Sequence, residues 1–150
     1  ASHAINLTKG IIANHKISTR QICLQINRHM NHASRLQLLH FLFGVAKSDG
    51  MVTENELHKI NTIAGYLNIN QYDFNSIKAM FYNEVDSSYK ILEIDKSATD
   101  VEVKTAYRKM VKKYHPDKLR SLGPEHVKGA EDKFRQVQSA YEHIQKERGI

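Results

Sequence analysis

His115, Pro116 and Asp117 form the segment of this 150-residue chain whose side chains are best suited to chemistry. An imidazole and a carboxylate two positions apart can work as an acid–base pair, or can bind a partner through hydrogen bonds and charge. Pro116 fixes the backbone torsion between them, so both side chains keep a preset geometry and lose little entropy on binding. The carboxylate of Asp117 only accepts hydrogen bonds, and its natural complement is an arginine fork on a partner.

An enzyme would need more groups than this pair. No nucleophile, glycine-rich phosphate loop or metal cluster accompanies the tripeptide in the sequence. We therefore interpret His115 as an orienting and hydrogen-bonding residue. We expect a binding protein that is not an enzyme and uses neither a cofactor nor a metal.

Most of the excess positive charge lies next to the tripeptide. The whole chain carries +6, and residues 101–120 alone hold seven cations against two anions, a balance of 7 − 2 = +5. Cations that recur every fourth residue share one face of a helix, and such a face steers a protein toward an acidic surface. The predicted binding residues are His115, Pro116, Asp117, Lys104, Arg108, Lys109, Lys112, Lys113 and Lys118.

Two other interpretations of the basic face remain open. A run of charge on a helix usually means a solvated surface, and only its conjunction with the tripeptide favours binding. A nucleic-acid role is disfavoured, because Tyr107 and Tyr114 fall on the packing face and do not interleave with the cations. Salt-dependent binding to arbitrary DNA or RNA would favour that role again.

Two long helices are predicted to hold the tripeptide between them. Thr99 with Glu102 forms a capping box that opens the first helix, and Pro116 ends it because proline disfavours helical geometry in the preceding residue. After a loop through Gly123-Pro124, apolar residues recur every three or four positions over 127–144. We expect an antiparallel hairpin. Its first helix packs through Val103, Ala106, Tyr107, Met110 and Tyr114.

Residues 19–82 are predicted to form about four short helices in a small bundle. The stretch 36–46 is apolar almost all round, which predicts a helix buried at the centre. Thr53 with Glu56 forms a second capping box, and Asn70 caps the fourth helix. No strand pattern competes, so the predicted fold class is all-α.

The chain is long enough for two small domains. A polar stretch at 83–88 marks the boundary, which gives a bundle over 1–85, with 1–18 as a partly ordered lead-in, and a second domain over 86–150. Asp86 is predicted to cap a brief helix that opens the second domain. The lone Cys23 is predicted to be a small core residue in a reducing compartment.

Two patterns mimic metal sites. Gly50 would be the turn glycine of a calcium loop, but Lys47 and Val45 fall where oxygen ligands are needed. His29 and His32 lie three apart, yet no cysteine or carboxylate follows at a matching distance, so we interpret them as surface residues. The acidic residues near the turn are interpreted as turn and cap residues: Asp49, Glu54 and Glu56.

The second half resembles the J domain of the DnaJ family. The resemblance covers roughly residues 86–147, where Tyr89-Lys90-Ile91-Leu92 and Ala106-Tyr107-Arg108-Lys109 precede the tripeptide, and Phe134 and Ala140-Tyr141 follow it. It implies that the tripeptide loop and the basic face dock on the ATPase domain of a DnaK-type (heat-shock-70 class) chaperone and trigger ATP hydrolysis. The alternative is a scaffold protein with a degenerate J domain.

The first half resembles the TerB-like helical domain that precedes the J domain in DjlA-type members. The resemblance rests on residues 36–82, above all on the segment from Val45 to Glu56. It implies that the first domain recruits or localises the protein through an unknown partner. No stretch approaches the ~20 apolar residues of a membrane span. We expect a cytoplasmic protein, at the inner face of a membrane if an upstream anchor was removed.

Overall fold

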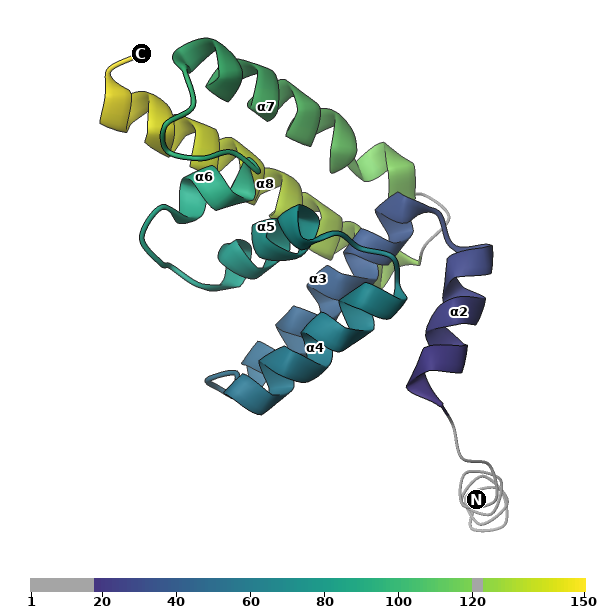
Figure 1. The fold of residues 1–150 in the computed structure, drawn as a ribbon. Coiled ribbons are helices and arrows are strands. Elements are labelled where there is room, and N and C mark those ends of the chain that lie inside the picture. The colour runs from purple at the N-terminus through teal and green to yellow at the C-terminus, as the bar shows by residue number, and fades with distance from the viewer. Residues whose placement is uncertain (1–17, 120–122) are drawn as a thin grey trace, which may run out of the picture.

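The computed structural model describes residues 18–119 and 123–150, and over these residues it contains helices and no strand (Figure 1). The all-α prediction is confirmed. Four helices make up the first half: α2 (Thr19–His29), α3 (His32–Ser48), α4 (Glu54–Tyr66) and α5 (Gln71–Phe81). The second half contains α6 (Ser87–Ile91), α7 (Asp100–Lys113), the 3-10 turn η1 (Pro116–Leu119) and α8 (Pro124–Arg148). The predicted lead-in lies almost wholly outside the described residues.

The helix starts follow the predicted caps. Thr53 with Glu56, and Thr99 with Glu102, each form a complete capping box, in which backbone N–H groups and side chains satisfy one another. Asn70 accepts from the N–H of Asp73 at 2.8 Å. Asp86 occupies the N-cap position of α6, as predicted, but its backbone is left-handed (φ 63) and its side chain makes no cap hydrogen bond.

The prediction of a central, all-round buried helix is only partly right for α3. Leu36, Leu39 and Phe43 are fully buried, where α3 packs against α4, α5 and α8. Phe41 and Val45 are 49% and 51% exposed. The neighbouring helices cover only one side of α3. Because α3 is apolar on all sides, the side that they leave uncovered is an exposed apolar face.

α7 and α8 lie side by side and antiparallel (Figure 1), as the hairpin prediction requires. The rings of Tyr107 and Tyr141 stack with centroids 4.1 Å apart and planes tilted by 6°. Pro124 occupies the first turn of α8, where its missing N–H costs nothing. The hairpin presents the turn η1 at one end.

One hydrophobic core runs through both halves of the chain. α5 packs against α6 and α8, while α3 packs against α8 and η1. Cys23 belongs to this core, as predicted. In the part of the chain that the structure describes, no helix is long and apolar enough to cross a membrane. The division at residues 85 and 86 stays a prediction, since the core does not separate there.

Candidate functional site

The tripeptide occupies the junction of α7 and η1 and faces solvent. The side chains of His115 and Asp117 are 47% and 62% exposed, and His115 Nδ1 lies 3.6 Å from a carboxylate oxygen of Asp117. The backbone N–H of Asp117 donates to the same Nδ1 at 3.2 Å. The backbone N–H of Lys118 donates to the carbonyl of His115 at 3.1 Å, which closes the turn. Both side chains can therefore reach a docked partner from a fixed backbone.

The ring of His115 also rests on α8. Its edge meets the ring of Phe134 at 5.8 Å between centroids and an interplanar angle of 79°. Such an edge-on contact limits the orientations of the imidazole. The imidazole is therefore held in place from α8.

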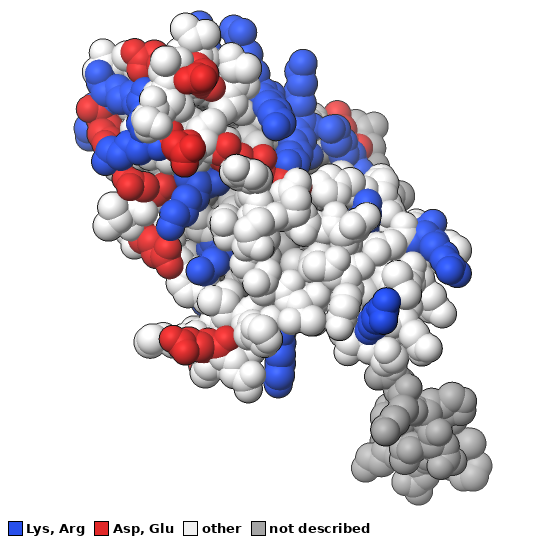
Figure 2. Space-filling view, in the orientation of Figure 1, with Lys and Arg blue, Asp and Glu red and all other residues white. Residues whose placement is uncertain are grey.

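The basic face of α7 is the surface beside the tripeptide. In Figure 2, Lys and Arg side chains gather over α7 in the upper part of the molecule, whereas the lower part is mostly uncharged. The exposed cations are Lys104, Arg108, Lys109 and Lys112 on α7 and Lys118 in η1. The structure thus presents five of the six predicted lysines and arginines to solvent.

Lys113 is the exception and corrects the predicted face. Its side chain is only 19% exposed and points inward, where its ammonium pairs with the carboxylates of Asp73 and Glu93. The cause is helical spacing, because Lys113 follows the fully buried Met110 by three residues and shares its face. Lys113 therefore lies away from the exposed surface in this structure.

Comparisons with known proteins now identify both halves. A family model described as tellurite resistance protein TerB matches residues 2–79, just over half of the chain, and a DnaJ domain model matches residues 87–149. The chain belongs to the TerB family and carries a J domain. Both resemblances inferred from the motifs are confirmed.

Relatives named co-chaperone protein DjlA match across the two halves. The one from Vibrio vulnificus is 33% identical over 141 residues, which is 89% of this chain and 46% of the relative. The one from Coxiella burnetii is 30% identical over 126 residues, 71% of this chain and 47% of the relative. The chaperone protein DnaJ of Thermoplasma acidophilum is 50% identical over 54 residues, 36% of this chain and 14% of the relative. The chain spans about half the length of the DjlA relatives. No solved structure gave a significant match.

Behind the J-domain tripeptide lies a buried polar pair that the sequence interpretation missed. Tyr114 is 2% exposed, and the ammonium of Lys133 lies 4.7 Å from the centroid of its ring. Burial lowers the pKa of Lys133 to about 7. The spacing contained a signal, because Lys133 lies three residues after Ala130 and four before Val137, both in the core.

The two metal mimics have other partners in the structure. Glu56 accepts hydrogen bonds from the backbone and hydroxyl of Thr53 at 2.8 and 2.9 Å. His32 contacts the carboxylate of Asp73 at 3.0 Å. Over residues 18–119 and 123–150, no group of three or more His, Cys, Asp or Glu side chains could hold a metal ion.

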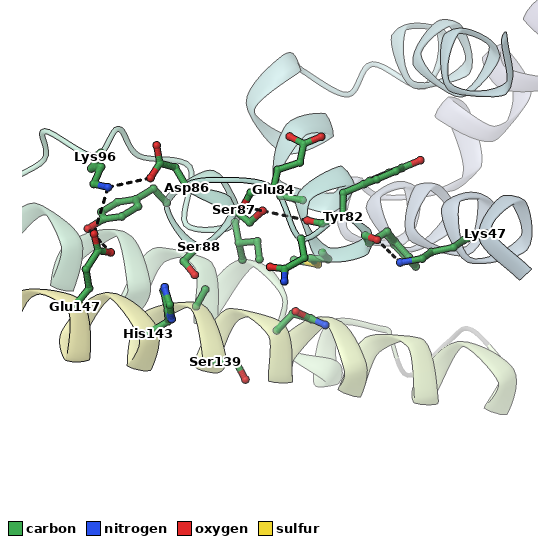
Figure 3. A pocket seen from close by; sticks show the side chains of 18 residues that line it. Lys47, Tyr82, Glu84, Asp86, Ser87, Ser88, Lys96, Ser139, His143 and Glu147 are labelled. Carbon is green, nitrogen blue, oxygen red and sulfur yellow. Dashed lines mark hydrogen bonds and ion pairs between the residues drawn. The ribbon is translucent and has the colours of Figure 1, made fainter. Parts of the chain in front are cut away.

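A hollow of about 610 Å³ lies between α8 and the turn that follows α5 (Figure 3). Its charged side chains already have partners. Lys96 bridges Asp86 at 3.2 Å and Glu147 at 3.3 Å, which joins the start of α6 to the end of α8. The hollow is lined by residues from both halves of the chain and does not include the tripeptide.

Proposed function

We propose that the protein is a J-domain co-chaperone that docks on a DnaK-type ATPase and stimulates its ATP hydrolysis. The single observation that carries the proposal is an exposed His115-Pro116-Asp117 turn at the end of a helix with an exposed cationic face. The DjlA relatives are named co-chaperones, which supports the same role.

The basic face and the turn have different tasks in this proposal. Lys104, Arg108 and the neighbouring cations draw α7 toward an acidic surface, because long-range charge mainly accelerates encounter. Asp117 then accepts hydrogen bonds from an arginine of the chaperone, while His115 orients the turn against Phe134. ATP is cleaved on the partner, and this chain supplies no reacting group.

Steady-state ATP hydrolysis by a DnaK-type chaperone, with a client peptide present, tests the proposal. The intact chain should raise the rate, and His115→Gln should abolish most of that increase. His143→Gln is the matched control, because His143 is exposed on α8 and lies nine residues beyond Phe134, which contacts His115. Equal stimulation by the parent and His115→Gln would contradict the proposal.

We also propose that the TerB-like half recruits or localises the J domain. We propose further that the chain works in the cytoplasm, because ATP is available there and the single cysteine needs no disulfide partner in a reducing compartment. The alternative is a scaffold protein that acts through the TerB-like half alone. The exposed apolar side chains of Phe41 and Val45 on α3 favour this alternative, because they could form a binding surface. Full cellular function of an Asp117→Asn variant would support the scaffold.

A further inference from the structure

Four ionisable side chains from both halves of the chain meet beneath the end of α7. Asp73 of α5 accepts from the ammonium of Lys113 and lies 3.0 Å from His32 of α3. Glu93, which follows α6, lies 3.2 Å from the same ammonium. The side chains of Asp73 and Glu93 are 1% and 8% exposed. Buried carboxylates need such partners, because an unpaired buried charge is costly.

The backbone at Glu93 adds an independent observation. Its φ is +60°, in the left-handed region that favours glycine. A side chain is strained there, and such strain persists where the surrounding structure uses the residue. A glycine would satisfy the turn but would leave Lys113 without its second carboxylate.

The two carboxyl groups titrate differently. Burial, followed by the adjacent Asp73, raises the pKa of Glu93 to about 7, although Lys113 opposes the shift. Burial alone would raise the pKa of Asp73, but hydrogen bonds with Glu93, Lys113 and His32 together hold it below its ordinary value. Asp73 is therefore the permanent anion opposite Lys113 near neutral pH.

α5 contacts the two residues directly before the tripeptide, Lys113 and Tyr114. Lys113 contacts Asp73, and the hydroxyl of the next residue, Tyr114, lies 3.5 Å from the hydroxyl of Ser76. Asp73 and Ser76 are three residues apart and share one face of α5. The first half of the chain thus holds two consecutive residues that lead into His115.

We propose that Asp73 and Glu93 are positioning residues, which hold the ammonium of Lys113 inward and thereby fix the end of α7 and the tripeptide that follows it. The inference rests on the proposed function. It makes the TerB-like half part of the J-domain trigger, in addition to any recruiting role. It also assigns Lys113 to the support of the turn and not to contact with the chaperone.

The two roles of Lys113 predict opposite effects of Asp73→Asn. If the cluster positions the turn, this variant needs a higher concentration for half-maximal ATPase stimulation, by about fivefold, the lower end of usual coupling between sites. Maximal stimulation should be unchanged, since the turn itself is intact. If Lys113 contacts the chaperone directly, its release should lower the half-maximal concentration, and that result would overturn the inference.

A double-mutant comparison tests whether Asp73 acts through Lys113. Asp73→Asn, Lys113→Gln and the double variant should give similar half-maximal concentrations, because each removes the ion pair between Asp73 and Lys113. Additive losses, or no loss in Asp73→Asn, would overturn the positioning role. Absence of stimulation by the parent chain would instead overturn the proposed function itself.

Glu93→Gly separates positioning from folding. Glycine relieves the left-handed backbone, so the thermal transition should stay or rise, while the half-maximal concentration still increases. Asn68→Gly is the matched control, because Asn68 also has a positive φ (61°) but lies in the turn between α4 and α5. Measurements are made well below the thermal transition, so that every variant is folded. An unchanged half-maximal concentration in Glu93→Gly would overturn the inference.

Discussion

The carboxyl of Glu93 keeps its proton to a higher pH than an ordinary glutamate, because burial and the adjacent Asp73 raise its pKa to about 7. The ionisable groups that face Glu93 are Asp73 from α5, Lys113 from α7 and, through Asp73, His32 from α3. In the unfolded chain Glu93 titrates near 4.5. The folded chain therefore binds more protons than the unfolded chain between these two values.

This difference predicts a pH-dependent stability. The contribution of Glu93 to the free energy of unfolding is fully present below about pH 4.5 and is lost as the pH rises through about 7. Glu93→Gln removes the titration, so its stability relative to the parent should increase from about pH 5 to about pH 8. Urea denaturation of both proteins at the two pH values measures it. A difference that is independent of pH would show that the pKa of Glu93 is the same in the folded and unfolded chains.

At the scale of elements, the crossing of α3 over α8 depends on one glycine. A Cβ at Gly129 would lie 2.5 Å from Nε2 of Gln37, which is 1% exposed and has little room to move. Gly129→Ala should therefore lower the free energy of unfolding by about 1–3 kcal/mol. Gly65→Ala is the control, because nothing lies within 4 Å of its Cβ and helix propensity should add about 0.5–1 kcal/mol. Thermal melts compare the two variants. Equal effects on stability would contradict a close contact between Gly129 and Gln37.

The exposed face of α7 leads to a prediction about binding without a change in fold. Arg108→Glu with Lys112→Glu should slow association with the chaperone by about tenfold at low salt, because steering depends on the sign of the surface charge. Helical content by circular dichroism should be unchanged, since exposed charges contribute little to stability. Lys59→Glu with Lys146→Glu is the matched control, because both residues are exposed cations on other helices. Loss of helix in the α7 variant would mean that this face packs.

At the scale of the whole molecule, the two family matches share one core. The hydroxyl of Ser76 in α5 donates to the carbonyl of Ile91 at 2.7 Å, a buried bond across the predicted boundary. α5 also packs on α6 and α8. Two regions that bury each other's surface gain stability together.

We therefore expect a single unfolding transition. Circular dichroism and tyrosine fluorescence should report the same midpoint in a thermal or urea titration, because separate units would melt separately. Tyr114 is buried against Ser76 of the first half, and Tyr89 is buried in the second half, so both contribute to the fluorescence signal. Two resolved transitions would support the predicted domain boundary at residues 85 and 86.

Much of the fold follows from neighbouring residues and was predictable. The capping boxes at Thr53 and Thr99 involve residues three apart, and the turn at Pro116 depends on its own ring. The four helices of the first half and the α7–α8 hairpin follow from apolar spacing of three and four. The tripeptide and its basic helix were likewise visible as local patterns.

Tertiary structure alone decided which side of each pattern meets solvent. The sequence pattern groups Lys113 with the other cations of α7. Its inward position could not be predicted, because its partners Asp73 and Glu93 lie 40 and 20 residues away in the chain. The outer face of α3, the burial of Lys133 and the left-handed backbone of Glu93 also depend on packing between distant segments. The sequence by itself thus determined the helices and the tripeptide with its basic helix, while packing between the two halves decided how the tripeptide is held. The physical reason is that local spacing sets helix and cap, whereas burial depends on contacts that no periodicity encodes.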